Sequence, residues 1–380
     1  MNVSHFSLSL PIIPIPMVKR TITAVLFVCS MGFSYAQIGG NTVYNILNYS
    51  YSARISGLGG GLISVDNDDP TMMIQNPSTI SDKFHTSFGI NFVDYFSNVG
   101  YGSAFYSHTF KKMGSFAFEL RYIGYGSFTN TDETGNEFGT FSVNDYAATV
   151  GWGRKLSDNL SIGANLKMIY SAYAENSSFG FATDVSGTYN IPDKMFSISL
   201  LFKNMGSQIV TYTPGNYEKL PFDIQLALSK RLEHVPVRLH LSLHSLYKWD
   251  MTYEGDDDPL LDVDAITGEY KYPSVFSQQV NNFFRHFTFG IEILPSKNFS
   301  LFTSFNYNRN REMYIPQNKS AAGFSYGLAF NIKTFRLSLS RSHYAVGAAP
   351  IYINLASNIN DLYELKKPTK KIKRITPEKD

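Results

Sequence analysis

The strongest constraint on this chain is the strict alternation of apolar and polar residues in many separate segments. In the segment 235–243 (VPVRLHLSL), valine and leucine alternate with Arg238 and His240, and the segments 196–203 (FSISLLFK) and 222–230 (FDIQLALSK) repeat the pattern. A period of two places the two sets of side chains on opposite faces of a β-strand. The segments extend over about 9 to 14 residues, longer than most strands of soluble proteins and long enough to cross a bilayer.

Short and long connections alternate between these segments. Six tight polar turns occur at 111–114, 155–159, 191–194, 232–236, 294–298 and 331–335. Longer and less regular loops separate them, among them 129–140, 204–221 and 250–285. Outer-membrane barrels combine short periplasmic turns with longer external loops and have an even number of strands. We therefore predict an all-β fold, a transmembrane antiparallel β-barrel of about 14 strands, with both chain termini in the periplasm.

The composition agrees with this prediction. Aromatic residues make up 15% of the chain and charged residues only 17%, whereas charged residues are about a quarter of typical proteins. No later segment has the ~20 consecutive apolar residues of a transmembrane helix. The net charge of +2 gives no indication of nucleic-acid binding, and we expect no nucleic-acid partner. We expect the chain in the cell outer membrane, with its apolar residues distributed over many strands.

The N-terminal residues have the features of a signal peptide. A basic pair precedes the apolar run 21–33, and small residues precede a cleavage site before Gln37. Met1 and Met17 are alternative starts of translation. The single cysteine, Cys29, lies in this region, so the mature chain has no cysteine for a disulfide or a metal site. The predicted organisation is a signal peptide (1–36), a plug segment (37–83), a β-barrel (84–363) and a basic periplasmic tail (364–380).

A glycine-rich segment without sustained alternation precedes the first predicted strand. Its glycines permit tight turns and close approach to a barrel wall, and Pro70 can start a short helix capped by Asp68 or Asp69. The segment lacks the βαβ context of a dinucleotide site, the Gly-Lys-Ser/Thr of a P-loop and the acidic spacing of an EF-hand. We predict that it fills the lumen as a plug. The plug residues that we single out are Gly57, Gly59, Gly60, Gly61, Asp66, Asp68, Asp69, Pro70, Asn76 and Pro77.

The same segment carries a resemblance to a known family. SARISGLGGGLISVDNDDPTMMIQNPSTIS (52–81) resembles the N-terminal signature of the FadL-like outer-membrane barrels, S-A-R-x-x-x-L-G-G followed by an acidic pair and N-P. LLFKNMG and LPFDIQLALSKRL resemble mid-chain elements of the same superfamily. More narrowly, the segments 37–60, 132–156 and 163–173 resemble the PorQ family, barrels of the type IX secretion system of Bacteroidetes. These motifs are family marks and not catalytic signatures.

The resemblance implies a FadL-like barrel with a role in a cell-surface attachment complex. A PorQ-type barrel would hold the surface protein PorZ, beside the sortase PorU on its own barrel, PorV. Cargo with a C-terminal signal is cleaved in such a complex and joined to anionic lipopolysaccharide. The implied partners are therefore a PorZ-like protein, indirectly PorU and PorV, and outer-membrane lipid and lipopolysaccharide.

The longest loop, 250–285, contains the candidate partner-binding residues. Aromatic side chains dominate protein–protein hot spots, but they also cap barrels and lie at lipid interfaces, and the sequence leaves these alternatives open. The aromatic candidates are Tyr270, Tyr272, Phe276, Phe283 and Phe284. Acidic residues of the same loop have the chemistry to bind calcium, although we favour a solvated loop. These acids are Asp256, Asp257, Asp258, Asp262 and Asp264.

No arrangement of residues indicates catalysis or a cofactor. His240 and His244 share one face of a predicted strand about 13 Å apart, too far for one metal ion, and we expect them to line the lumen. The sequence contains neither a G-x-S-x-G nor an H-E-x-x-H motif. We therefore assign no catalytic, cofactor-binding or metal-binding residues and expect no enzyme activity. For the basic tail 366–380, we favour a disordered end over a contact with anionic headgroups.

Two functions are compatible with these sequence features. The first is a non-enzymatic type IX secretion barrel that anchors a PorZ-like surface partner and supports cargo processing and attachment to lipopolysaccharide. The alternative is a FadL-type channel for hydrophobic small molecules, motivated by the plug, because FadL-like relatives use a plug to gate the lumen. The residue types expected to face the lumen are Ser, Lys, Arg, His and Gln, which disfavours a route for apolar molecules.

Overall fold

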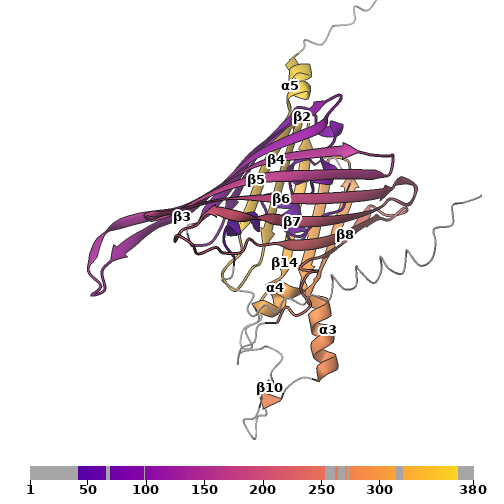
Figure 1. Cartoon of the computed structure of the whole chain (residues 1–380). Helices are drawn as coiled ribbons and strands as arrows, with labels where there is room; N and C mark the ends of the chain where they lie inside the picture. The colour runs from indigo at the N-terminus through magenta and orange to yellow at the C-terminus, as the bar shows by residue number, and fades with distance from the viewer. Residues whose placement is uncertain are drawn as a thin grey trace, which may run out of the picture. The chain divides into compact units, whose positions relative to one another are not determined.

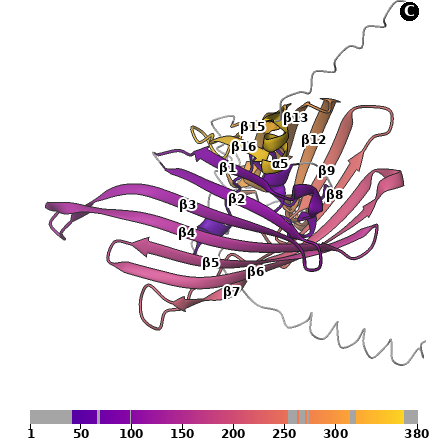
Figure 2. The ribbon, with the colours of Figure 1, turned by 90° about the horizontal axis from the view of Figure 1, so that it is seen from above.

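The computed structural model describes residues 42–65, 69–97, 99–252, 262–263, 270–271, 274–313 and 320–366. The predicted signal peptide and most of the predicted tail lie outside these residues. Within them, fourteen antiparallel strands form a closed barrel (Figure 1, Figure 2). Each barrel strand pairs with the next one along the chain, and the first pairs with the last, which confirms the predicted β-barrel.

The barrel strands are 7 to 19 residues long, a wider range than the sequence predicted. In chain order they are β1 (Ser87–Asp94), β2 (Gly100–Phe110), β3 (Gly114–Thr131), β4 (Glu137–Lys155), β5 (Leu160–Tyr173), β6 (Asn176–Ile191), β7 (Phe196–Val210), β8 (Asp223–Arg231), β9 (Val237–Leu243), β12 (Phe287–Ser296), β13 (Phe299–Asn306), β14 (Phe324–Ile332), β15 (Phe335–Ser342) and β16 (Ile351–Asn358).

The predicted tight turns join consecutive strands at one end of the barrel. For example, β2 ends at Phe110 and β3 begins at Gly114, while β14 ends at Ile332 and β15 begins at Phe335. β1 begins and β16 ends at this same end, which we call the short-turn end. The remaining connections, which are mostly longer, lie at the opposite, long-loop end. Thr42, the first described residue, bridges Lys219 in the connection between β7 and β8, so the described chain begins at the long-loop end. The prediction that both termini lie on the same side of the membrane is therefore wrong for the described N-terminal end, because the plug runs through the lumen from the long loops to β1.

Burial alternates along the strands as the sequence pattern requires. In β9, Leu239 is exposed on the outside of the barrel, whereas His240 is buried on the lumen side. In β12, Phe289 and Ile291 are exposed and Glu292 is buried. The barrel therefore has an apolar outer surface and a mostly polar inner wall, as outer-membrane barrels do. No helix in the described part of the chain is long and apolar enough to cross a membrane.

Strands β3 and β4 continue beyond the barrel wall as a hairpin that projects at the long-loop end (Figure 1). The pairing of β2 with β3 ends at Gly124, and the pairing of β5 with β4 ends at Val143, but β3 and β4 pair with each other to Thr131. The prediction of a loop over 129–140 is therefore wrong for most of these residues, because 129–131 belong to β3 and 137–140 belong to β4. The sequence missed the extension because polar and apolar residues do not alternate where both faces meet solvent.

The predicted plug lies inside the barrel. Residues 42–65 and 69–84 form a series of short helices with irregular links, and most of their apolar side chains are buried. Their contacts reach β4, β5 and β6 on one side and β13 to β16 on the other, so the plug crosses the lumen. Its helices are η1 (Asn45–Leu47), α2 (Ala53–Gly57), η2 (Pro70–Met72), η3 (Pro77–Thr79) and η4 (Asp82–Phe84).

The other described elements lie in turns, in loops or at the C-terminus. They are η5 (Pro192–Lys194), β10 (Asp262–Val263), β11 (Tyr270–Lys271), α3 (Val275–Arg285), α4 (Tyr307–Glu312) and α5 (Ile359–Lys366). β10 and β11 pair only with each other. The predicted loop 250–285 therefore contains an α-helix, which was not expected from the sequence.

Candidate functional site

The glycine-rich part of the plug lies directly against the barrel wall. A Cβ atom on Gly57 would lie 2.2 Å from the ring of Phe302, and one on Gly59 would lie 2.2 Å from the Thr288 methyl group. Gly59 has a φ of 96° and Gly60 a φ of 83°, which are left-handed conformations that favour glycine. Backbone of the plug therefore packs where a side chain would not fit.

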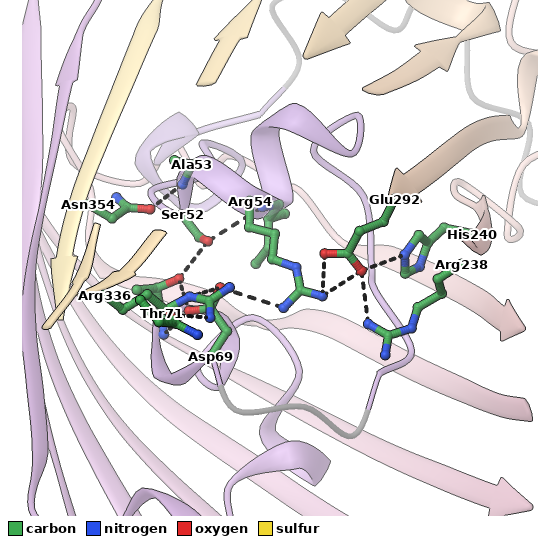
Figure 3. Close-up of polar contacts among 12 residues, drawn as sticks. Ser52, Ala53, Arg54, Asp69, Thr71, Arg238, His240, Glu292, Arg336 and Asn354 are labelled. Atoms are coloured by element: carbon green, nitrogen blue, oxygen red, sulfur yellow. Dashed lines mark hydrogen bonds and ion pairs between the residues drawn. The ribbon is translucent and has the colours of Figure 1, made fainter. Parts of the chain in front are cut away.

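The centre of the plug is joined to the wall by a buried ionic network (Figure 3). Arg54 of α2 places its Nη2 atom 2.7 Å from Oε1 of Glu292 on β12. Arg238 on β9 donates to Oε2 of the same carboxylate at 2.9 Å, and His240 Nε2 lies 3.6 Å from it. The Glu292 side chain is 0% exposed, so its charge depends on these partners. Ser229 Oγ contacts His240 Nδ1 at 2.8 Å.

Asp69 forms a second ionic centre between plug and wall. Its Oδ2 atom lies 3.1 Å from Nε of Arg336 on β15 and 3.7 Å from Nη1 of Arg54. Its Oδ1 atom accepts from the backbone N–H of Thr71 at 3.1 Å, so Asp69 caps η2, which begins at Pro70. Burial by itself raises the pKa of the Asp69 carboxyl, but Arg336 and Arg54 outweigh it and hold that pKa below its ordinary value.

Glycines of the wall accommodate the last part of the plug. Asn76 donates to the Ile63 carbonyl and to Ser199 Oγ, both at 3.2 Å, and Pro77 starts η3. A Cβ atom on Gly163 of β5 would lie 2.2 Å from the Pro77 carbonyl group. The plug and the wall are therefore fitted to each other by glycines on both sides.

The first part of the plug fills the lumen toward the long-loop end with apolar and tyrosine side chains. Tyr51 packs edge-on against Tyr101 of β2, with ring centroids 5.0 Å apart, and the Arg121 guanidinium lies 4.7 Å from the Tyr51 ring centroid. Burial raises the pKa of the Tyr51 phenol, so this group is neutral. The lumen is therefore aromatic near the long loops and ionic nearer the short turns.

The C-terminal part of helix α3, at the long-loop end, turns polar side chains toward the protein. Arg285 donates to Asn308 at 3.3 Å, and the Tyr307 hydroxyl donates to Asn281 Oδ1 at 3.2 Å. Asn282 donates to Asp250 at 3.2 Å. These polar residues of α3, Asn281, Asn282 and Arg285, are buried although their types are usually exposed.

The apolar side of α3 faces outward. Phe276 is 78% exposed, and the exposed apolar residues of the helix are Val275, Phe276, Val280, Phe283 and Phe284. At its C-terminal end, this surface meets Phe287 of β12, whose ring centroid lies 4.8 Å from that of Phe283. The usual orientation of an amphipathic helix is thus reversed in the C-terminal part of α3, whereas residues 275–280 are all exposed, the polar ones included.

The structure separates the predicted site residues into groups. Gly57, Gly59, Gly60, Gly61, Asp69, Pro70, Asn76 and Pro77 lie in the plug, and Phe276, Phe283 and Phe284 lie on α3. Tyr270 belongs to β11, of which only the backbone is described. Asp66, Asp68, Tyr272, Asp256, Asp257, Asp258 and Asp264 fall outside the described residues. His240 faces the lumen, whereas His244 lies just beyond the end of β9 and so does not share a strand with it.

Four residues of the ionic centres, Arg54, Arg238, Glu292 and Arg336, were not among the predicted site residues. Arg54 was noted only as part of a family signature, and Glu292 stands alone in an otherwise apolar strand segment, IEILP. An isolated carboxylate or guanidinium on the lumen face of a predicted barrel strand is a usable signal, because such a group requires an opposite charge nearby. The described residues contain no group of three or more potential metal ligands.

No protein-family model and no curated protein matches this sequence. Solved structures match the fold. The Pseudomonas putida toluene transporter TodX superposes with a TM-score of 0.51 at 11% identity, covering 82% of this chain and 99% of that chain. A Pseudomonas aeruginosa FadL homologue gives a TM-score of 0.42 at 10% identity, covering 79% of this chain and 96% of that one. The chain therefore shares the barrel fold of TodX.

Proposed function

We propose that this chain is a non-enzymatic outer-membrane barrel that anchors a partner protein at its long-loop end. The observation that carries the proposal is the exposed apolar surface of α3, on which Phe276 is 78% exposed, although polar residues of the same helix are buried. A partner that covers this surface removes aromatic area from water, and aromatic residues contribute strongly to binding hot spots. In the orientation that we propose, the long loops face the cell exterior and the end of β16 faces the periplasm.

The filled lumen supports anchoring over transport. The plug is attached by the Arg54–Glu292 ion pair, by the Asp69–Arg336 ion pair and by backbone packing against wall glycines. Moving the plug would leave buried charges without their partners, which costs about 3–5 kcal/mol for each such charge. A barrel with a firmly held plug is a rigid platform for a partner.

The more specific proposal rests on the sequence resemblance to the PorQ family. We propose that the partner is a PorZ-like surface protein of a type IX secretion attachment complex, with PorU and PorV as indirect partners. Such a complex works beside lipopolysaccharide, to which its cargo becomes attached. The exposed apolar surface of α3 has the chemistry to receive a surface protein of this kind.

A pull-down from detergent-solubilised outer membrane tests the anchor. The variant Val275→Ser/Phe276→Ser removes apolar area at the free end of α3, away from the contacts of Phe283 with Phe287. We expect the wild type to recover a surface protein in near-equal amount and the variant to recover at least tenfold less. Phe138→Ser is the matched control, because Phe138 is an exposed aromatic residue on the projecting hairpin of the same barrel end.

Two results would contradict the anchor. One is a wild-type barrel that purifies without any surface protein. The other is equal loss of the partner in the α3 variant and in the Phe138 control, since the effect would then not be specific to α3. Amounts of folded barrel, measured by heat-dependent gel mobility, must match among the samples.

A second candidate function is a channel for hydrophobic small molecules. The tyrosine-rich part of the lumen around Tyr51 and Tyr101 favours it, because binding sites for such molecules are mostly apolar and aromatic. Mass spectrometry of the purified barrel tests this function by identifying bound fatty acids or aromatic hydrocarbons. Bound ligand in a barrel without a protein partner would make the channel the better proposal.

A further inference from the structure

We propose that the lumen at the short-turn end holds a binding site for a phosphate group. A cavity of about 540 Å³ lies there between the plug and the wall. Residues of the β12–β13 turn line it, which places it at the mouth of the barrel. Its cationic lining residues are Arg54, Arg231, Arg238, Lys297 and Arg336.

Two of these cations stand directly opposite each other. Arg231 at the end of β8 pairs in register with Arg238 of β9, and Arg238 pairs in register with Glu292 of β12 on its other side. Like charges opposite each other on neighbouring strands destabilise a sheet. Glu292, on the β12 side of Arg238, balances the positive charge of Arg238. A bound anion on the β8 side would balance the positive charge of Arg231.

Positive charge at the cavity exceeds the negative charge of its described surroundings. The carboxylates that pair with the five cations are Glu292, which lines the cavity, and Asp69, which binds Arg336 and Arg54. Both carboxylates are fully buried and already paired. Glu233 lines a neighbouring cavity together with Arg231, and with this third carboxylate counted, the five cations still leave two positive charges in excess. This excess requires counterions in solution and favours a multiply charged ligand.

The cavity also offers unused hydrogen-bond donors. Each guanidinium has five N–H donors, and Arg238 directs only Nη1 to Glu292 in the contacts described above. The Arg231 side chain makes no hydrogen bond or ion pair with the described residues, and it also lines two neighbouring cavities, of about 440 and 260 Å³. Guanidinium groups bind phosphate through paired N–H donors, which is the chemistry required here.

The ligand that fits is a phosphate group, either as the free ion or as a phosphate monoester. The cavity is larger than a single oxyanion, and Leu294 and Phe299 give it an apolar side that a monoester could contact. Ser300 and Asn331 add neutral polar groups to the lining. An uncharged apolar ligand would leave the cationic groups without compensation.

Phosphorus NMR and calorimetry on the purified full-length barrel in a non-ionic detergent test the site at constant ionic strength. The probes are inorganic phosphate and glucose 6-phosphate. The variant Arg231→Gln/Lys297→Gln removes two cations that take no part in the plug ion pairs. We expect saturable binding by the wild type and at least tenfold weaker binding by this variant. Equal affinity for both probes would indicate a site for the free ion, and tenfold tighter binding of glucose 6-phosphate a site for monoesters.

Lys111→Gln/Lys112→Gln is the matched control, because it removes two exposed charges from another turn at the same barrel end. This control should bind both probes like the wild type. The absence of saturable binding by the wild type would overturn the proposal. So would equal weakening in the control and the Arg231 variant, because the effect would then be general electrostatic attraction.

Discussion

Arg54 of the plug and Glu292 of the barrel wall form an ion pair of 2.7 Å between two side chains that are almost completely buried. The two residues come from distant parts of the sequence, and the pair joins the helix α2 to the strand β12. Glu292 also binds Arg238, so one carboxylate serves two guanidinium groups. Loss of this single carboxylate should therefore disturb the plug and the wall together.

Replacing Glu292 by Gln is expected to destabilise the folded barrel strongly. The change leaves Arg54 and Arg238 without their common counter-charge in a buried site, which costs about 3–5 kcal/mol. Urea unfolding in lipid vesicles, followed by tryptophan fluorescence, measures the loss. Glu137→Gln on the exposed hairpin should change stability by less than about 0.5 kcal/mol. In a double-mutant cycle with Arg54→Gln, additive losses would show that the two residues are not coupled.

Replacing Gly163 by Ala is expected to displace the plug. The added methyl group would lie 2.2 Å from the Pro77 carbonyl group, and overpacking of this kind costs about 1–3 kcal/mol. Limited proteolysis should cut the plug faster in this variant than in the wild type. Gly187→Ala is the control, because its new methyl group would meet no atom closer than 4.0 Å. Equal cleavage of the two variants would argue against close packing at Pro77.

Asp69→Asn is expected to destabilise the protein at neutral pH by about 3 kcal/mol, because Arg336 and Arg54 lose a buried counter-charge. The folded protein holds the pKa of Asp69 below its ordinary value, so the carboxylate stabilises the protein above about pH 4. This stabilisation is lost as the pH falls through the folded-state pKa. The stability difference between wild type and variant should therefore shrink in acid. Asp193→Asn, in the exposed turn helix η5, should show no such difference at any pH.

His244 is expected to make the barrel less stable in mild acid. Burial, with His286 and Arg309 nearby, lowers its pKa from 6.5 to about 4. Between these values the unfolded chain binds a proton that the folded chain does not, so stability falls as the pH falls, by up to about 3 kcal/mol. The unfolding temperature, measured at pH 7.5, 5.5 and 4.5, should decrease less in His244→Gln than in the wild type. The exposed His234→Gln should follow the wild type, and parallel curves for all three proteins would contradict this role of His244.

The barrel could be predicted because its determinants are local. Alternation in segments such as 235–243 fixes which side chains face outward, and the short turns fix the pairing of consecutive strands. The importance of the plug glycines could also be predicted from the sequence, because it is local as well. Gly59 and Gly60 adopt backbone conformations that other residues disfavour. The helix cap at Asp69 also follows from its position before Pro70.

The ionic networks and the orientation of α3 depend on contacts that the sequence does not display. Glu292 meets Arg54 only after the plug has entered the barrel and the strands have taken their register. In α3, a helical period predicts two faces, but an apolar face is ordinarily assigned to the interior. The contacts of Arg285 with Asn308 and of Asn281 with Tyr307 show that polar residues of α3 face inward.

The pairing of β1 with β16 joins the first strand of the barrel to the last, with Ser87 opposite Asn358. The plug touches both strands of this seam, since η2 contacts β1 and β16, and α2 contacts β16. Opening the seam would therefore break plug contacts as well as the hydrogen bonds between the two strands. The N-terminal segment thus acts as a clamp that holds the closure of the cylinder from within.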